Sequence, residues 1–326
     1  MIQEQADAAL AKRIPIGCCL TAGTFMPQGA AGASSSDVRD DPVERLLAGI
    51  ACIYAAGYDF AELAAGAITA LPEREFDRLR GELAVRGWSI PVYNSLIPPT
   101  LKLTGPLVDD RAIADYVGLA LGRAAATGAE VVVFGSGGAR SVPDGYPVGA
   151  AMEQIIRFLH LCGEHAARCG ITVAIEPLNR KESNIIRTVA EAWQVAEALK
   201  LSHVRVLADA YHMHAEGEPP DIAGIVARAG MLAHVHYAEP DRRFPVGEAK
   251  GTAETGPSRE AGQPKSERAP SARTGIGRLF SLLHESGYSG RISAECMEPE
   301  GLRNCEKSLQ YVRTIQDEVL NRGERK

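Results

Sequence analysis

The chain has 326 residues, of which 45% are hydrophobic and 23% charged, with a formal net charge of −6. That length allows two domains, but barrels of alternating strands and helices also reach it as one domain. The acidic balance gives no basic footprint for nucleic acid, and no apolar run reaches the roughly 18 residues of a membrane span.

Short apolar runs alternate with amphipathic helical patterns along the whole chain. The predicted strands cover residues 14–20, 58–63, 89–94, 130–134, 171–175, 204–207, 232–237 and 291–294. The predicted helices cover residues 41–56, 72–86, 109–127, 150–169, 189–199, 222–228, 275–285 and 302–320. Short strands alternating with helices favour parallel β-α units, and eight units favour a closed barrel. We therefore predict the α/β class and a single (β/α)8 TIM-barrel domain over residues 1–326.

Residues 247–274 interrupt this alternation after the seventh strand. The segment is rich in Gly, Pro, Ser and Ala with charges of both signs, and it has no aromatic or large aliphatic residue. It buries too little apolar surface to offset the entropy of ordering, so we predict a mobile low-complexity insertion. On the rim of a barrel it could be a lid, a partner contact or an inert insertion, and we favour the last.

Two features bear on location. The first residues are acidic and polar and lack the apolar core of a secretory signal. The seven cysteines are odd in number and contain no C-x-x-C pair, which favours reduced thiols over disulfides or structural zinc. We therefore expect a cytoplasmic protein.

Four candidate metal ligands end or follow the last four predicted strands: Glu176, Asp209, His236 and Glu295. The carboxyl ends of barrel strands converge on one mouth, so these side chains should lie together. One such acid alone could be a salt bridge or a helix cap, but four in register predict a metal site. Three carboxylates with one imidazole suit a hard divalent ion, with Mn²⁺ as the first choice and Mg²⁺ or Co²⁺ as alternatives.

Four motifs occur at the same strand ends. E-x-L-N-R-x-E spans residues 176–182 and D-x-x-H spans residues 209–212. H-x-H ends at His236 with Arg242 six residues later, and an A-E pair ends at Glu295. With these motifs the chain resembles the xylose isomerase-like barrels, and within them the D-tagatose 3-epimerase and D-psicose 3-epimerase group. The resemblance covers nearly the whole chain apart from the amino-terminal segment and the insertion.

This resemblance implies roles for seven residues. The metal ligands would be Glu176, Asp209, His236 and Glu295, and the residues contacting substrate hydroxyls would be Glu182, His212 and Arg242. The partner would be a small-molecule sugar, and the resemblance alone points to a homo-oligomer.

The residue types also fit proton transfer beside a carbonyl. A sugar carbonyl and its neighbouring hydroxyl can chelate an open metal site, and the cation then stabilises an enediolate as a Lewis acid. Moving the carbon-bound proton needs a carboxylate on each face, and Glu176 and Glu295, on nonadjacent strands, are the candidate pair. Arg242 could hold a developing oxyanion, or it could be a surface residue beside Asp241 and Arg243. We predict a metal-dependent isomerase or epimerase of a ketose or oxo-sugar.

Other interpretations stay open on the sequence alone. The same scaffold serves inosose dehydratases, hydroxypyruvate isomerases and lyases of 3-oxo-glycosides, which all begin with proton abstraction beside a carbonyl. A non-catalytic sugar-binding barrel is the alternative from another functional class. Such a protein would be expected to have lost a metal-ligating residue or the second glutamate, and none is lost here. An apurinic endonuclease would need a basic groove for phosphates, which the net charge disfavours.

The glycine-rich segment after the fourth predicted strand has two interpretations. Residues 135–138, Gly-Ser-Gly-Gly, could cradle a phosphate through backbone N–H groups, but the segment lacks the terminal Lys-Ser/Thr of a P-loop. We predict a tight turn that lets substrate approach the backbone.

His234 points to the same side of its strand as His236 and is predicted to pack in the barrel interior or to support the metal ligand.

Overall fold

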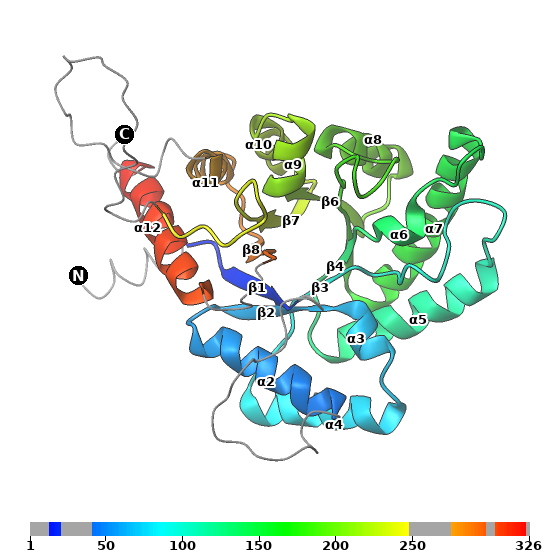
Figure 1. The fold of residues 1–326 in the computed structure, drawn as a ribbon, viewed down its shortest axis with the longest axis horizontal. Helices are drawn as coiled ribbons and strands as arrows, with labels where there is room; N and C mark the ends of the chain where they lie inside the picture. The colour runs from blue at the N-terminus through cyan, green and yellow to red at the C-terminus, as the bar shows by residue number, and fades with distance from the viewer. Residues whose placement is uncertain (1–12, 21–40, 248–274, 298–303, 324–326) are drawn as a thin grey trace, which may run out of the picture.

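The computed structural model describes residues 13–20, 41–247, 275–297 and 304–323. Eight parallel strands pair in chain order, and β8 pairs back with β1 to close a barrel (Figure 1). The strands are β1 (Ile16–Leu20), β2 (Phe60–Ala64), β3 (Val92–Asn94), β4 (Val131–Phe134), β5 (Thr172–Ile175), β6 (Val204–Asp209), β7 (Leu232–Tyr237) and β8 (Arg291–Ala294). The predicted barrel is confirmed. The predicted insertion follows β7, but its residues 248–274 lie outside the described residues, and the single domain over the full chain stays a prediction.

Helices surround the barrel (Figure 1). The main helices are α2 (Pro42–Ala55), α4 (Glu73–Arg86), α5 (Asp110–Ala126), α7 (Val148–Cys169), α8 (Val189–Leu199), α10 (Asp221–Arg228), α11 (Gly275–Glu285) and α12 (Cys305–Gly323). The sequence pattern does not predict three short helices, α3 (Ala65–Thr69), α6 (Gly137–Arg140) and α9 (Ala210–Glu216). Each follows an even-numbered strand and is too short to show helical periodicity.

One of these short helices begins at the barrel mouth because of a carboxylate. The side chain of Asp209, at the end of β6, accepts hydrogen bonds from Tyr211 N at 2.7 Å and His212 N at 3.2 Å. An aspartate that accepts these free N–H groups stabilises the first turn of a helix. The same residue therefore ends the strand, starts α9 and fixes where His212 lies.

The barrel interior changes from apolar to polar along the strands. An apolar interior cluster comprises Phe60, Val92, Val131, Val133, Ala174 and Leu207. Gly17 lets Phe60 fill the base of the barrel, because a Cβ at that glycine would lie 2.2 Å from the ring. Side chains two residues apart share one face of a strand, so Glu62, Glu176 and Asp209 stand above Phe60, Ala174 and Leu207. Charged groups are thereby collected at the carboxyl ends.

The structure bears on the cysteines and on membrane-spanning helices for the residues that it describes. No disulfide joins the cysteines that the structure describes. Most of the cysteine side chains are buried, which fits a packing role. Within the described part of the chain, no helix combines the length and apolarity needed to cross a membrane.

Candidate metal centre and active site

The four predicted metal ligands meet at the carboxyl end of the barrel. Glu176 follows β5, Asp209 ends β6, His236 lies in β7 and Glu295 follows β8. Each offers one ligand atom, and these atoms all lie within 4.8 Å of one another. We call these four residues the metal cluster. Three oxygen donors and one imidazole nitrogen within this spacing fit one divalent ion.

His236 is oriented with one ring nitrogen toward the other three residues of the cluster and the other toward Glu62 on β2. Its Nδ1 lies 3.1 Å from Glu176 Oε1, 3.6 Å from Glu295 Oε2 and 3.9 Å from Asp209 Oδ2. Its Nε2 lies 2.9 Å from Glu62 Oε1, and the side chain is fully buried. Nδ1 is therefore the nitrogen that faces the other three ligands.

The metal-free cluster favours bound protons because it is buried and because its carboxylates lie close together. Burial, together with the neighbouring Glu176 carboxylate, raises the pKa of Glu295 to about 8, although His236 opposes the shift. Burial alone would lower the pKa of His236, but the Glu62 and Glu295 carboxylates outweigh it and raise that pKa well above its ordinary value. A cation that binds carboxylates and a neutral imidazole replaces such protons. The donor set and its electrostatics thus fit a metal ion.

Arg242 reaches into this cluster from the loop after β7. Its Nη2 donates to Glu295 Oε2 at 2.7 Å and its Nη1 to Glu182 Oε1 at 2.9 Å. The guanidinium carbon lies 4.7 Å from the centre of the Tyr211 ring. The backbone of Arg242 is left-handed, with φ of 65°, in a turn closed by a hydrogen bond from its N–H to Glu239 O. The alternative of a surface arginine does not hold, because the side chain is only 14% exposed.

His212 presents a buried donor to the mouth. Its Nδ1 accepts a hydrogen bond from Asn179 N at 3.1 Å. The ring therefore carries its proton on Nε2 when neutral. Nε2 is buried, has no hydrogen-bond partner among the described residues and lies 3.9 Å from Asp209 Oδ2. A substrate hydroxyl would satisfy it.

Asn179 is a site residue that sequence reasoning did not single out. Besides its backbone bond to His212, its Nδ2 lies 2.8 Å from His212 Nδ1 and 3.3 Å from Glu182 Oε1. It thus ties together two of the predicted substrate-binding residues. The available signal was its place inside the E-x-L-N-R-x-E motif.

Glu62 on β2 is a second residue beside the metal cluster that the sequence did not reveal. It is fully buried, and its Oε1 and Oε2 lie 2.9 Å from His236 Nε2 and 3.1 Å from His234 Nε2. Burial would raise the pKa of Glu62, but the two imidazoles outweigh it and hold the pKa well below its usual range. The only signal was one acid in the apolar run F-A-E-L-A.

The surroundings of Glu62 are also buried. His234 has no exposed surface, and its Nε2 lies 3.1 Å from Ser293 Oγ as well as from Glu62. It is therefore an interior residue that also supports the site. Cys19 groups with Glu62 and His236, and burial, followed by the Glu62 charge, raises the pKa of its thiol well above the ordinary value. With no cation beside it, the thiol is therefore protonated.

The glycine-rich segment 135–138 turns from β4 into the short helix α6, with a left-handed backbone at Ser136. The approach of a substrate to this backbone stays a prediction, and at Gly135 the structure gives a second reason for glycine. A Cβ on Gly135 would lie 2.1 Å from Glu176 Oε2. The glycine is needed because the Glu176 carboxylate approaches the backbone at this point.

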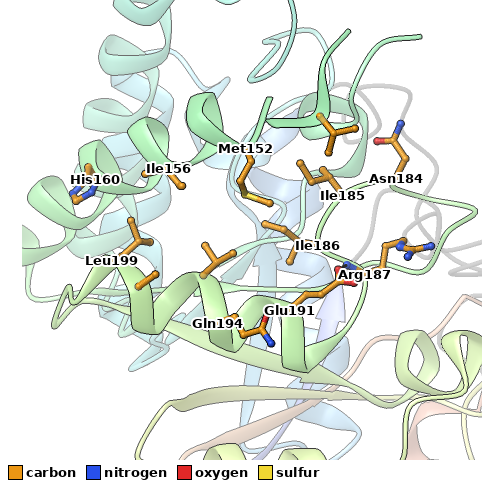
Figure 2. A pocket seen from close by; sticks show the side chains of 13 residues that line it. Met152, Ile156, His160, Asn184, Ile185, Ile186, Arg187, Glu191, Gln194 and Leu199 are labelled. Carbon is orange, nitrogen blue, oxygen red and sulfur yellow. Dashed lines mark hydrogen bonds between the residues drawn. The ribbon is translucent and has the colours of Figure 1, made fainter. Parts of the chain in front are cut away.

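A separate groove lies on the outside of the barrel. Figure 2 shows side chains of α7, α8 and the segment before α8 around it, among them Met152, Ile156, Ile186 and Leu199. Its volume is about 500 Å³, and none of the seven predicted site residues lines it. Its lining is mostly apolar, with Arg187 and Glu191 as its charged residues.

Known proteins share this fold and parts of this sequence. Residues 50–315 match the family model of the xylose isomerase-like TIM barrel. The chain belongs to this family. The match confirms the family indicated by the strand-end motifs.

Two curated proteins that are similar in sequence to this xylose isomerase-like barrel are sugar epimerases. A 3-dehydro-D-guloside 4-epimerase of Escherichia coli (strain K12) is 36% identical over 87 residues, 27% of this chain and 33% of that protein. A D-psicose 3-epimerase of Enterocloster bolteae is 32% identical over 91 residues, 28% of this chain and 30% of that protein. The matched segments span about a third of each relative.

A solved structure extends the likeness over most of the chain. The apo crystal structure of a 3-keto-D-glucoside 4-epimerase from E. coli matches with a TM-score of 0.67 at 19% identity. The match covers 93% of this chain and 100% of that chain. At this identity it shows the shared xylose isomerase-like fold alone.

Proposed function

We propose that this xylose isomerase-like barrel is a metal-dependent isomerase or epimerase of an unphosphorylated ketose or related oxo-sugar. The observation that carries the proposal is the pairing of Glu176 and Glu295, carboxylates from nonadjacent strands, at one metal cluster. The names of the two epimerase relatives support the reaction class. Mn²⁺ is the proposed ion because carboxylate oxygens with one imidazole suit it.

The two carboxylates would exchange the carbon-bound proton. A divalent cation held by the metal cluster would supply Lewis-acid polarisation of the sugar carbonyl. One of Glu176 and Glu295 takes the proton from the carbon beside the carbonyl, which leaves an enediolate. The other returns a proton to the opposite face, which inverts that carbon.

Three further residues would fix the sugar between them. Arg242 holds the Glu295 carboxylate through Nη2 and leaves its positive charge beside the reacting oxygens. His212 offers its Nε2–H to a hydroxyl. Glu182, 37% exposed, lies further toward solvent and accepts from a second hydroxyl. Together they present a single carbon to the carboxylate pair.

Several finer points rest on the sequence. The unphosphorylated substrate follows from the lack of a P-loop-like motif, and the homo-oligomeric state and the cytoplasmic location stay predictions. Nothing in the acidic composition favours a nucleic-acid substrate over a sugar.

Isotope exchange tests the reaction. The Mn²⁺-loaded protein is incubated in D₂O with a panel of ketoses, inososes and 3-oxo-glycosides. We expect one member to gain deuterium at the carbon next to the carbonyl and to yield an isomer of the same mass otherwise. Loss of water or of an aglycone would move the protein to the dehydratase or lyase class. Absence of deuterium in every panel member would contradict the proton-transfer mechanism.

A further inference from the structure

Glu62 lies beside the metal cluster without belonging to it. It comes from β2, whereas the four ligands come from the ends of β5, β6, β7 and β8. It is fully buried and lies inside the barrel, 2.9 Å from the ring nitrogen of His236 that faces away from the other ligands. A buried ionised carboxylate is costly unless its hydrogen bonds are satisfied, so its retention there calls for a reason.

The carboxylate divides its two oxygens between two imidazoles. Oε1 contacts His236 Nε2 at 2.9 Å and Oε2 contacts His234 Nε2 at 3.1 Å. An ionised carboxylate only accepts hydrogen bonds, so both nitrogens must carry their protons toward it. With its proton on Nε2, neutral His236 has its lone pair on Nδ1, the nitrogen 3.1 Å from Glu176 Oε1.

We propose that Glu62 is a positioning residue of the metal site, which fixes the tautomer and the ring orientation of His236 so that Nδ1 faces Glu176, Asp209 and Glu295. The inference rests on the metal dependence in the proposed function but not on the identity of the sugar. Metal-bound histidines commonly donate their other ring N–H to a carboxylate, and loss of such a partner lowers metal affinity.

The variant Glu62→Gln keeps the shape of the side chain but removes this constraint. The amide can turn its NH₂ group toward His236 Nε2, which would place the imidazole proton on Nδ1, the wrong nitrogen for the cluster. His234→Gln is the matched variant, because it removes the other imidazole beside Glu62 and leaves the contact with His236 in place. A general role in core packing would make the two substitutions equivalent.

Titration of the metal-free full-length proteins with Mn²⁺, followed by electron paramagnetic resonance, measures the effect. We expect Glu62→Gln to weaken Mn²⁺ binding by about 10- to 100-fold and His234→Gln to weaken it clearly less. Unchanged affinity in Glu62→Gln, or equal losses in both variants, would overturn the positioning role. A wild-type protein that binds no divalent ion would instead overturn the metal site itself, and the positioning role with it.

A measurement on the wild-type protein guards against a variant that does not fold. Nitrogen-15 NMR of the protein loaded with diamagnetic Mg²⁺ reports which nitrogen of His236 carries the proton. We expect a protonated Nε2 and an unprotonated Nδ1. The reverse assignment would refute the role of Glu62 whatever the variants do.

Discussion

The two ends of the barrel interior differ in chemistry over a very short distance. Phe60, Ala174 and Leu207 belong to the apolar interior cluster, and two residues further along the same strands stand Glu62, Glu176 and Asp209. Two residues of a strand cover only about 7 Å. The apolar end packs without charged groups, whereas the charged end brings together carboxylates that repel one another. The same alternation of side chains thus builds a packed apolar base and a charged mouth that a bound cation would stabilise.

The largest effect should follow from changing the mouth itself. Glu295→Gln removes a proton-transferring carboxylate and a metal ligand, so we expect activity to fall by roughly 10²- to 10⁴-fold or more. The fold should survive, because the variant also removes one of the crowded charges. Steady-state assays of the product found by isotope exchange, with circular dichroism as the control of folding, check this. A variant that keeps a tenth of the activity would contradict the assigned role.

The second prediction concerns how the stability of the protein depends on pH, without and with metal. In metal-free protein the pKa of Glu295 is raised to about 8 and that of His236 is raised as well, so the folded state keeps protons that the unfolded chain releases. Stability must then decrease as pH rises, from the ordinary range of a glutamate up to about 8. Bound metal should remove most of this slope, because it replaces those protons.

Thermal unfolding from about pH 5 to about pH 8, the range over which the protons are lost, measures this pH dependence. The series is recorded once with a chelator and once with excess Mn²⁺, and the two slopes are compared. The Glu295→Gln variant is the control, since it lacks the carboxyl group that titrates. A metal-free protein whose unfolding temperature rises steadily over this range would show that the charges do not crowd as described.

The smallest effect is expected at the other end of the barrel. Glu130, just before β4, forms an ion pair with Arg291, the first residue of β8, and the two side chains are 57% and 29% exposed. Both lie at the amino ends of their strands, whereas the metal cluster lies at the carboxyl ends. Exposed pairs contribute little, so Glu130→Gln should change the free energy of unfolding by less than about 1 kcal/mol. Activity should stay at the wild-type level. A large loss of activity would mean that the two ends of the barrel are coupled.

Sequence reasoning recovered the features that depend on local pattern. The runs 232–237 and 189–199 coincide with β7 and α8, because the first is bounded by clear turns and the second begins at the capping residue Thr188. The metal cluster could be predicted because parallel strands bring their carboxyl ends to one edge. That rule needs only the order of the strands.

The features that were missed depend on contacts across the barrel. Glu62 meets His236 across 174 residues of sequence, and no local pattern links them. Asn179 matters through its bonds to His212, on another strand end. The short helix α9 is set by the Asp209 side chain rather than by periodicity. Only three-dimensional proximity shows that these residues belong to the site.

The close approach of Glu176 to Gly135 limits how this protein can be diversified. A methyl group at position 135 would lie 2.1 Å from the carboxylate oxygen and would displace it, whereas Gly66 and Gly81 have open space around them. In a saturation library, we expect position 135 to return only glycine among active clones, while the other two positions tolerate many residues. A search for altered sugar preference is therefore better directed at Tyr211, beside Arg242, than at this loop.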